Sequence, residues 1–412
     1  MNRPALCLYV QHLMGIGHQR RMAAIARACV ARGFAVTYVS GGMPVAELDT
    51  DGCEVVQLPP CRSPDLRFAE LVDANGAVVT DAWREQRITL LLQAWRSRSH
   101  SALLTETYPF GRKLMQFELL PLVDVARADG ALIVSSVRDI VEHRPKLNKY
   151  TRMADAVLRS YDAVLVHSDP NVMPFDESFP AIGMIQQLLH YSGYVDEHNL
   201  PIDQATKAKL GRQSAVQLGG VKAALEYPTT PTDGDGEVIV SAGGGAYGLH
   251  LLEAALAAAR LPAGADYRWR ILVGENVPER SFIELLRGAP EHVIVEHARQ
   301  DFRALLVRAC ASISQGGYNT TMDVLATGVR AVVVAYHDET EREQLIRGRV
   351  LQRLGLLRML PNAELTPAAL LVALRDAITL APKEIQLQRD GARISADRLW
   401  QWVEAGTCQR ES

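Results

Sequence analysis

The stretch SISQGGYNTTMDVLATGVRAVVV, residues 312–334, restricts the possible fold more than any other part of this sequence. Residues 311–314 form a short, partly apolar run that ends in a small polar residue. A Gly-Gly turn follows, 320–327 have helical spacing, and 331–335 again read as a buried strand. The unit is therefore strand, glycine turn, helix, strand, which favours a parallel sheet covered by helices. Polar residues crowd the turn, where the first amides of the helix have no partners of their own. Such a turn either makes a tight bend or holds a ligand, often an anion.

The same alternation fills both halves of the chain. Apolar strands are expected near 6–10, 35–40, 55–58, 102–105, 131–134 and 163–166, with helical patterns between them. The polar segment 196–236, with its run YPTTPTDGDG, is typical of a linker or an insertion. We therefore expect an α/β chain with two doubly wound, Rossmann-like domains at 1–195 and 237–383. A helix within 384–412 is expected to pack back on the first domain.

The composition excludes several classes of protein. The 412 residues carry a formal net charge of -3, so there is no basic footprint for nucleic acid. The six cysteines form no C-x-x-C pair, which favours reduced thiols in a cytoplasmic chain. The N-terminus does not resemble a signal peptide, and no apolar run reaches the roughly 18 residues needed to span a bilayer. Peripheral contact with a membrane stays open.

A second glycine loop, VSAGGGAYG, follows the strand expected near 237–241. It is neither an ATPase P-loop nor a G-x-G-x-x-G dinucleotide fingerprint. Both glycine loops of this half would lie at carboxyl ends of strands in one sheet, where open α/β sheets bind ligands. A diphosphate held between them, with no metal and no lysine clamp, is the simplest functional interpretation. The residues expected to hold it are Gly243, Gly244, Gly245, Ser314, Gly316, Gly317, Asn319 and Thr320.

Three further side chains of this half are candidates for binding other parts of the same ligand. Asp323, one turn into the helix after the Gly-Gly turn, has a carboxylate suited to the two hydroxyls of a ribose, or it is a charge near a helix start. Glu343 and Gln344 begin the helix after the strand 331–335, where they either contact sugar hydroxyls or form a solvated helix start.

The first half has a comparable turn, in which Gly15 and Gly17 precede His18 at a helix start. The positive helix end favours a neutral imidazole, which is suited to act as a general base, although a helix-capping histidine fits as well. Glu106 directly follows a strand and is placed to orient His18 or to bind an acceptor. Further acceptor-side candidates are Arg112, Arg138 and Asp139, with the pairs Arg112–Glu118 and Arg138–Asp139 as purely structural alternatives.

Taken together, these motifs resemble a known family. The segments are GIGHQRR, SGGMP, ETYPFGR, FELLPL, SVRDI, SAGGG, SQGGYNTTMDVLATG and EREQLIR. Over nearly the whole chain they resemble the GT-B glycosyltransferases, and within these the bacterial enzymes related to family 28, which includes the peptidoglycan N-acetylglucosaminyltransferase. The stretch 314–323 also resembles part of the donor motif of plant-type UDP-glycosyltransferases. The segment 196–236 matches no part of the family pattern.

The resemblance implies a GT-B fold with two domains that face a cleft, the first for the acceptor and the second for the donor. It implies an inverting, metal-independent transfer of a hexose or N-acetylhexosamine from a nucleotide sugar, with UDP as the expected nucleotide and no cofactor. His18 matches the base of the plant-type relatives, Asp323 the ribose ligand, 243–245 the phosphate loop, and Glu343 with Gln344 the sugar-contacting pair. The acceptor is unidentified, either a small molecule or a lipid-linked one. A nucleotide-sugar epimerase on the same fold and a non-catalytic partner subunit are the alternatives.

Overall fold

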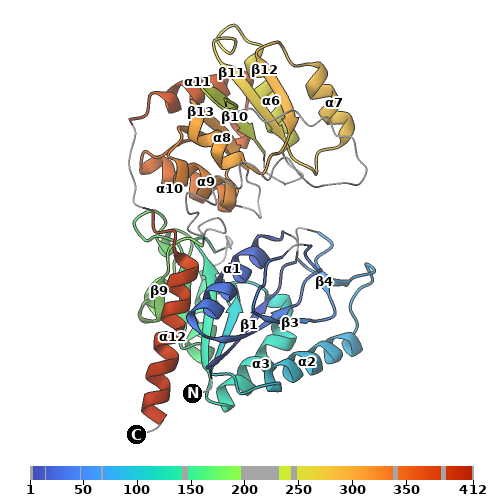
Figure 1. Cartoon of the computed structure of the whole chain (residues 1–412), viewed down its shortest axis with the longest axis vertical. Coiled ribbons are helices and arrows are strands. Elements are labelled where there is room, and N and C mark those ends of the chain that lie inside the picture. Colours follow the sequence, from blue (N-terminus) through green and yellow to red (C-terminus); the bar gives the residue numbers. More distant parts are fainter. Residues whose placement is uncertain are drawn as a thin grey trace. The chain divides into compact units, whose positions relative to one another are not determined.

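The computed structural model describes residues 3–13, 15–46, 48–65, 68–141, 147–195, 232–242, 248–336, 342–381 and 387–410. The chain divides into two compact units (Figure 1). Unit 1 is formed by Met1–Asn199 together with Leu387–Ser412, and unit 2 by Leu200–Gln386. Each unit is a parallel sheet with helices on both faces, which confirms the α/β, Rossmann-like architecture expected from the sequence.

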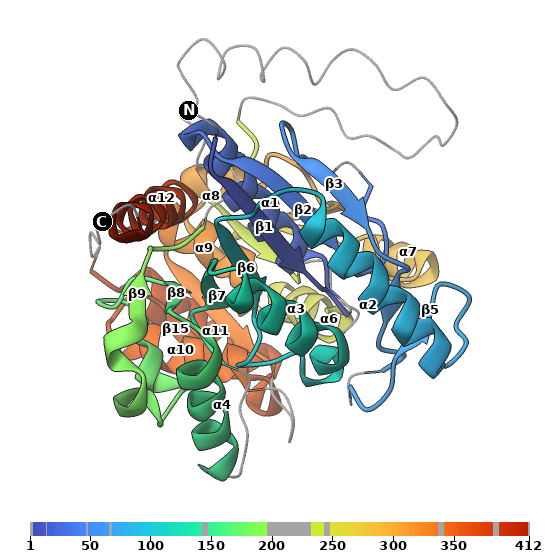
Figure 2. The same cartoon turned by 90° about the horizontal axis from the view of Figure 1, so that it is seen from below.

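Unit 1 contains a seven-stranded parallel sheet in the order β3-β2-β1-β6-β7-β8-β9, which can be followed across Figure 2. Its strands are β1 Ala5–Val10, β2 Ala35–Ser40, β3 Glu54–Gln57, β6 Ala102–Glu106, β7 Leu132–Arg138, β8 Ala163–His167 and β9 Leu189–Tyr191. A small antiparallel pair, β4 Cys61–Arg62 and β5 Val72–Asp73, stands apart from it. The strand order reverses between β1 and β6, so the carboxyl ends of these two strands form the switch point of the sheet.

Two hydrophobic cores cover the faces of this sheet. One lies between the sheet and helices α1 Gly17–Arg32 and α12 Gly391–Arg410. The other is formed with α2 Asp81–Arg96, α3 Gln116–Ala128 and α4 Leu147–Ser160. The strands are buried on both sides because each side chain faces one of these cores, which explains their continuous apolar runs.

Helix α12, the red helix of Figure 1, belongs to unit 1 although it ends the chain. Its Trp400 ring packs edge-on against Phe34 and under the Arg32 guanidinium, and Gly33 leaves the space that this ring occupies. The return of the C-terminal segment to the first domain is therefore confirmed. The helix expected within 384–412 begins at Gly391, whose Cα lies so close to the Gly193 and Tyr194 backbone that a Cβ would not fit.

Unit 2 contains a six-stranded parallel sheet in the order β12-β11-β10-β13-β14-β15. The strands are β10 Glu237–Ser241, β11 Arg268–Val273, β12 Val293–His297, β13 Ala311–Gln315, β14 Ala331–Ala335 and β15 Arg358–Pro361. Its helices are α6 Leu249–Ala259, α7 Glu279–Arg287, α8 Phe302–Arg308, α9 Tyr318–Thr327, α10 Glu343–Arg353 and α11 Pro367–Ile378. The switch point of this sheet lies between β10 and β13.

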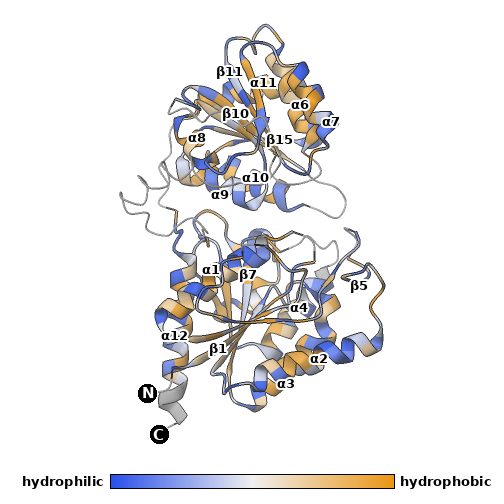
Figure 3. Cartoon of the chain, turned by 45° about the vertical axis from the view of Figure 1, so that its right-hand side comes forward, coloured by the Kyte–Doolittle hydropathy of each residue, from blue (hydrophilic) through white to orange (hydrophobic). Residues whose placement is uncertain are grey.

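The two faces of the second sheet differ in chemistry. Apolar side chains of one face pack against α6, α7 and α11, and α6 is coloured almost entirely as hydrophobic in Figure 3. The opposite face carries the buried polar residues Glu237, Arg270, Glu296, Ser312 and Ser314. Burial of a charge is costly unless the charge is paired, so the charged side chains on this face need partners of opposite charge.

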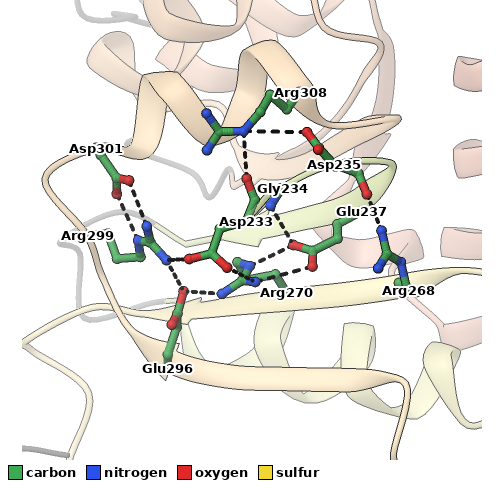
Figure 4. Close-up of polar contacts among 10 residues, drawn as sticks. All are labelled: Asp233, Gly234, Asp235, Glu237, Arg268, Arg270, Glu296, Arg299, Asp301 and Arg308. Atoms are coloured by element: carbon green, nitrogen blue, oxygen red, sulfur yellow. Dashed lines mark hydrogen bonds and ion pairs between the residues drawn. The ribbon is translucent and has the colours of Figure 1, made fainter. Parts of the chain in front are cut away.

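Figure 4 shows how those charges are paired. Arg270 contacts Glu237 at 2.6 Å, Glu296 at 2.9 Å and Asp233 at 3.2 Å, and Arg299 contacts Asp233 at 2.8 Å. Asp233 and Asp235 precede β10, so these contacts, with those from Arg268 and Arg308, fasten residues 232–236 to the sheet. The end of the polar segment 196–236 is therefore part of unit 2, whereas 196–231 lie outside the described residues.

The fold bears on two expectations, the one about membrane-spanning segments and the one about the cysteines. No helix in the described part of the chain combines the length and the apolar character needed to cross a membrane. The five cysteines whose side chains are described, Cys7, Cys29, Cys53, Cys61 and Cys310, are all free thiols.

Candidate active site and donor-binding turn

The switch point of unit 1 brings together the residues that the sequence singled out on both sides of it. The turn after β1 leads into α1, so His18 lies in the first turn of this helix. Glu106 is the last residue of β6, the neighbouring strand. Gln19 fixes the start of α1 because its buried amide contacts Ser40, Tyr38 and His12. Strand β6 and helix α1 therefore hold Glu106 and His18 side by side.

His18 and Glu106 are in direct contact. His18 Nδ1 lies 2.5 Å from Glu106 Oε1; the carboxylate is fully buried and 18% of the imidazole side chain is exposed. Within the described residues no partner is recorded for Nε2 of His18. The sequence suggested that Glu106 orients His18. The contact between the Glu106 carboxylate and Nδ1 of His18 is present in the structure.

The charge states of this pair follow from its surroundings. The pKa of His18 is lowered to about 3, mainly by burial; the charges of Arg112 and Arg138 act in the same direction, and Glu106 acts in the opposite one. Burial alone would raise the pKa of Glu106, but His18, Arg112 and Arg21 lower it below its usual range. Near neutral pH the pair is a carboxylate and a neutral imidazole. An ionised carboxylate only accepts hydrogen bonds, so Nδ1 carries the proton and Nε2 keeps its lone pair.

Several groups hold the Glu106 carboxylate in place. Arg21 contacts Oε1 at 2.5 Å, Arg112 lies 3.7 Å from Oε2, and the Thr107 hydroxyl donates to Oε1. Thr107 and Arg112 have φ angles of 63° and 59°, in the left-handed region that non-glycine residues rarely adopt. Each such residue costs about 1 kcal/mol or more, which the surrounding contacts must offset.

Arg112 does not pair with Glu118, the structural alternative considered for it. Its Nε donates to the Gln11 carbonyl at 2.6 Å, and its charge faces Glu106. Glu118 is instead held by Arg87 at 2.6 Å and 2.7 Å and by the Tyr9 hydroxyl. Arg112 therefore contacts the His18–Glu106 site, and its role on the acceptor side stays a prediction.

The remaining acceptor-side candidates lie around the same switch point. No atom of the described chain lies within 4 Å of a Cβ built at Gly15 or Gly17, so packing does not require glycine there. Arg138 ends β7, and its charge lowers the His18 pKa. Asp139 is fully buried next to it.

In unit 2 the Gly-Gly turn lies between β13 and α9 at the switch point of the sheet. A Cβ at Gly316 would lie 2.9 Å from Val333 and 3.2 Å from Gln344, whereas one at Gly317 would meet no described atom within 4 Å. No side chain caps α9 at Gly317, and the Ser314 hydroxyl is buried without a partner among the described residues. Asn319 is exposed and Thr320 half-buried in the first helical turn. Gly316 is thus explained by packing, and Gly317 is not.

Helix α10 closes this turn from the other side. Gln344 accepts from the Tyr336 amide at 3.0 Å, which ties the helix to the end of β14. Glu343 is paired with Arg347 at 2.7 Å, and Arg347 also donates to the Gly316 carbonyl at 3.0 Å. The structure therefore brings Gly316, Glu343 and Gln344 together, as expected from the sequence.

Asp323 lies in the middle of α9 and is engaged by a neighbour. Its Oδ1 accepts from Arg303 Nε at 2.9 Å and Nη2 at 2.6 Å, an ion pair that links α8 and α9. Both side chains are partly exposed, 28% for Arg303 and 19% for Asp323. A second role for Asp323 in ribose binding remains a prediction. Gly243, Gly244 and Gly245 lie outside the described residues.

Sequence reasoning missed three arginines at these sites. Arg21 lies one turn after His18, and Arg347 one turn after Glu343, so in each case the i,i+3 or i,i+4 spacing was a signal that could have found them. Arg303 contacts Asp323 from a different helix, and no local spacing points to it.

Comparisons with known proteins agree with this architecture. Residues 238–396 match the glycosyltransferase family 28 C-terminal domain. Over 114 residues the chain is 31% identical to the UDP-N-acetylglucosamine–N-acetylmuramyl-(pentapeptide) pyrophosphoryl-undecaprenol N-acetylglucosamine transferase of Rubrobacter xylanophilus. That alignment covers 28% of this chain and 31% of the relative, so the chain spans about a third of the length of the curated relative it matches.

Solved structures of similar fold cover nearly the whole chain. The glycotransferase of kitacinnamycin has a TM-score of 0.59 at 15% identity and covers 100% of this chain and 99% of its own. Os79 from O. sativa, solved in complex with UDP, has a TM-score of 0.57 at 16% identity and covers 98% of this chain and 100% of its own. Residues 238–396 are thus similar to the glycosyltransferase family 28 C-terminal domain, and over nearly its whole length the chain has the GT-B fold of these solved glycosyltransferases.

Proposed function

We propose that this chain transfers a hexose or N-acetylhexosamine from a UDP-sugar to an acceptor hydroxyl, with inversion at the anomeric carbon and without a metal ion. The His18–Glu106 pair is the observation that carries this proposal. The proposed donor follows from the relative named for a UDP-N-acetylglucosamine substrate and from the UDP complex of Os79. The acceptor is a small molecule or a lipid-linked one.

His18 is the proposed general base. A neutral imidazole accepts the proton of an acceptor hydroxyl at Nε2 while Nδ1 stays bonded to Glu106. The imidazolium that forms is stabilised by the buried carboxylate, which itself stays ionised because Arg21 and Arg112 face it. Proton removal as the hydroxyl attacks the anomeric carbon gives a glycoside of opposite configuration and releases UDP.

The Gly-Gly turn and the start of α9 are the proposed diphosphate site. Open space at Gly317 lets the phosphates approach the backbone, and the first amides of a helix are donors with a favourable dipole. Gln344 and Glu343 are the proposed contacts to the sugar hydroxyls. In this arrangement amides and a helix end take the role that a metal ion has in other phosphate sites.

The reaction is tested by incubating the protein with UDP-sugars and a panel of hydroxyl acceptors in EDTA. We expect UDP release that depends on acceptor and product of inverted configuration by NMR. Formation of an epimer without UDP release would make the chain an epimerase, and neither product with any donor would favour a non-catalytic subunit. Full loss of activity in EDTA that magnesium restores would contradict the amide-based phosphate site.

Asp323→Ala is expected to weaken UDP binding about 10- to 100-fold, because the carboxylate would lose hydrogen bonds to two ribose hydroxyls. The measurement is calorimetric titration with UDP and with 2′-deoxy-UDP. If Asp323 binds the ribose, wild type distinguishes the two ligands and the variant does not.

Arg303→Ala is the matched control, since it removes the ion pair of Asp323 and leaves the carboxylate in place. It is expected to keep the preference for UDP over 2′-deoxy-UDP. Equal UDP affinity in wild type and a folded Asp323→Ala variant would leave Asp323 with the Arg303 ion pair as its role.

A further inference from the structure

Arg347 is a charged side chain buried directly beneath the donor-binding turn. It lies in α10 and only 1% of it is exposed. Nη1 donates to the Gly316 carbonyl at 3.0 Å, Nη2 contacts Glu343 Oε1 at 2.7 Å, and the guanidinium lies 5.5 Å from the centre of the Tyr318 ring. One cation therefore joins the glycine turn, the start of α9 and the start of α10.

The bond to Gly316 fixes the direction of the next amide. Among the described residues the one cis peptide bond is Tyr108–Pro109. The bond between Gly316 and Gly317 is therefore trans. In a trans peptide the C=O and N–H groups point in opposite directions. With its carbonyl directed at Arg347, the peptide directs the Gly317 N–H away from the buried guanidinium. The backbone beside this amide is open, since a Cβ on Gly317 would meet no described atom within 4 Å.

Without such a contact the peptide would have two orientations. Glycine adopts positive and negative φ with similar ease, so a Gly-Gly peptide can rotate and present its carbonyl where its amide was. A carbonyl oxygen there would repel an anion. A hydrogen bond from a charged donor is stronger than one between neutral groups, so the guanidinium favours the orientation with the amide outward.

The charge of Arg347 is already balanced. Glu343 Oε1 forms an ion pair with Arg347 at 2.7 Å. The Glu343 side chain is 16% exposed, whereas Arg347 is 1% exposed. The effect of Arg347 on an anionic ligand therefore comes through the orientation of the turn rather than through an excess of positive charge.

We propose that Arg347 is a positioning residue that holds the Gly316–Gly317 peptide with its amide directed at the diphosphate of the donor. The proposal rests on the proposed nucleotide-sugar function and assigns to that site a residue that touches no substrate itself. It predicts a defect confined to the phosphates, since the nucleoside is not bound by this peptide.

The test compares three probes, UDP, uridine and inorganic pyrophosphate, by calorimetric titration of wild type and Arg347→Met. We expect the affinities for UDP and pyrophosphate to fall about 10- to 100-fold, because the variant loses the hydrogen bond from the Arg347 guanidinium that orients the peptide. The affinity for uridine is expected to stay within about two- to three-fold of wild type. Equal losses for UDP and uridine, or no loss for UDP, overturn the proposal. Failure of wild type to bind UDP at all overturns the proposed donor and this inference with it.

Arg270→Met is the matched control, because it also removes a buried, ion-paired arginine from unit 2 but lies on the β10–β12 side of the sheet. It is expected to lower the melting temperature and to leave the UDP-to-uridine affinity ratio unchanged below that temperature. If Arg347→Met does not fold, Arg347→Lys carries the same test, since lysine keeps the charge and one donor. A loss of a few-fold confined to UDP and pyrophosphate supports the proposal, and an unchanged ratio of UDP to uridine affinity overturns it.

Discussion

Replacing His18 by alanine is expected to reduce acceptor-dependent turnover about 100- to 10,000-fold, the usual effect of removing a general base. The affinity for the UDP-sugar is expected to stay close to wild type, because the proposed donor contacts lie in unit 2. Turnover by UDP release and donor titration on the same preparation measure both quantities. A large fall in turnover with unchanged donor affinity is the result that assigns the base to His18.

His190→Ala is a suitable control, since His190 is another partly buried histidine of unit 1, with its ring 4.8 Å from that of Trp402. It is expected to turn over like wild type. If His18→Ala stays within a few-fold of wild type, the role of base moves to Glu106 or Asp139. A parallel loss of donor affinity would make His18 a binding residue.

The pH profile provides a second readout of the same prediction. A base works only when unprotonated, and burial lowers the pKa of His18 to about 3, so the active form persists below the usual histidine range. The acid limb of kcat/KM is therefore expected below pH 6.5. An acid limb at or above pH 6.5 in wild type would show that the imidazole is not held neutral in this way.

Most of the fold follows from local sequence patterns. Strands such as 102–105 and 163–166 are continuous apolar runs, because a parallel sheet buries both faces. The strands β9 and β15 were missed. Each is three or four mostly half-buried residues long and lies at an edge of a sheet, where pairing is decided by tertiary contacts rather than by a periodic pattern.

The sequence predicted which residues form the candidate site, but not every physical cause of their charge states. The sequence placed His18 and Glu106 near the ends of two strands of one sheet. These strands, β1 and β6, are neighbours in the sheet, which brings the two side chains together. His18 was expected to stay neutral because of the helix end, whereas the first cause of its lowered pKa is burial. Burial, and the charges of Arg112 and Arg138 that act with it, come from residues distant in the sequence, and no local pattern contains them. For the same reason the full burial of Arg87 does not follow from its local sequence.

Among the described residues of unit 1, Arg87 and Glu118 form the most enclosed ion pair, with both side chains 0% exposed. Besides Glu118, Arg87 donates to the carbonyls of Gly41 at 2.8 Å and Pro59 at 2.6 Å and to the Gln11 amide oxygen at 3.0 Å. These contacts leave no room for a Cβ at Gly41, 2.5 Å from Arg87. The pair thus anchors the loop after β2 and the residue after β1, next to the His18 turn.

Arg87→Met is expected to lower the free energy of unfolding by about 3–5 kcal/mol, because it leaves the Glu118 carboxylate buried without its cation. Glu118→Met is expected to cost a similar amount for the opposite charge. The double variant removes both charges and is expected to be more stable than the sum of the two losses predicts, since no uncompensated charge remains. Urea denaturation of the four proteins measures the coupling. Additive losses would mean that the two side chains stabilise unit 1 separately, Arg87 through the loop carbonyls and Glu118 through Tyr9, and not as an ion pair.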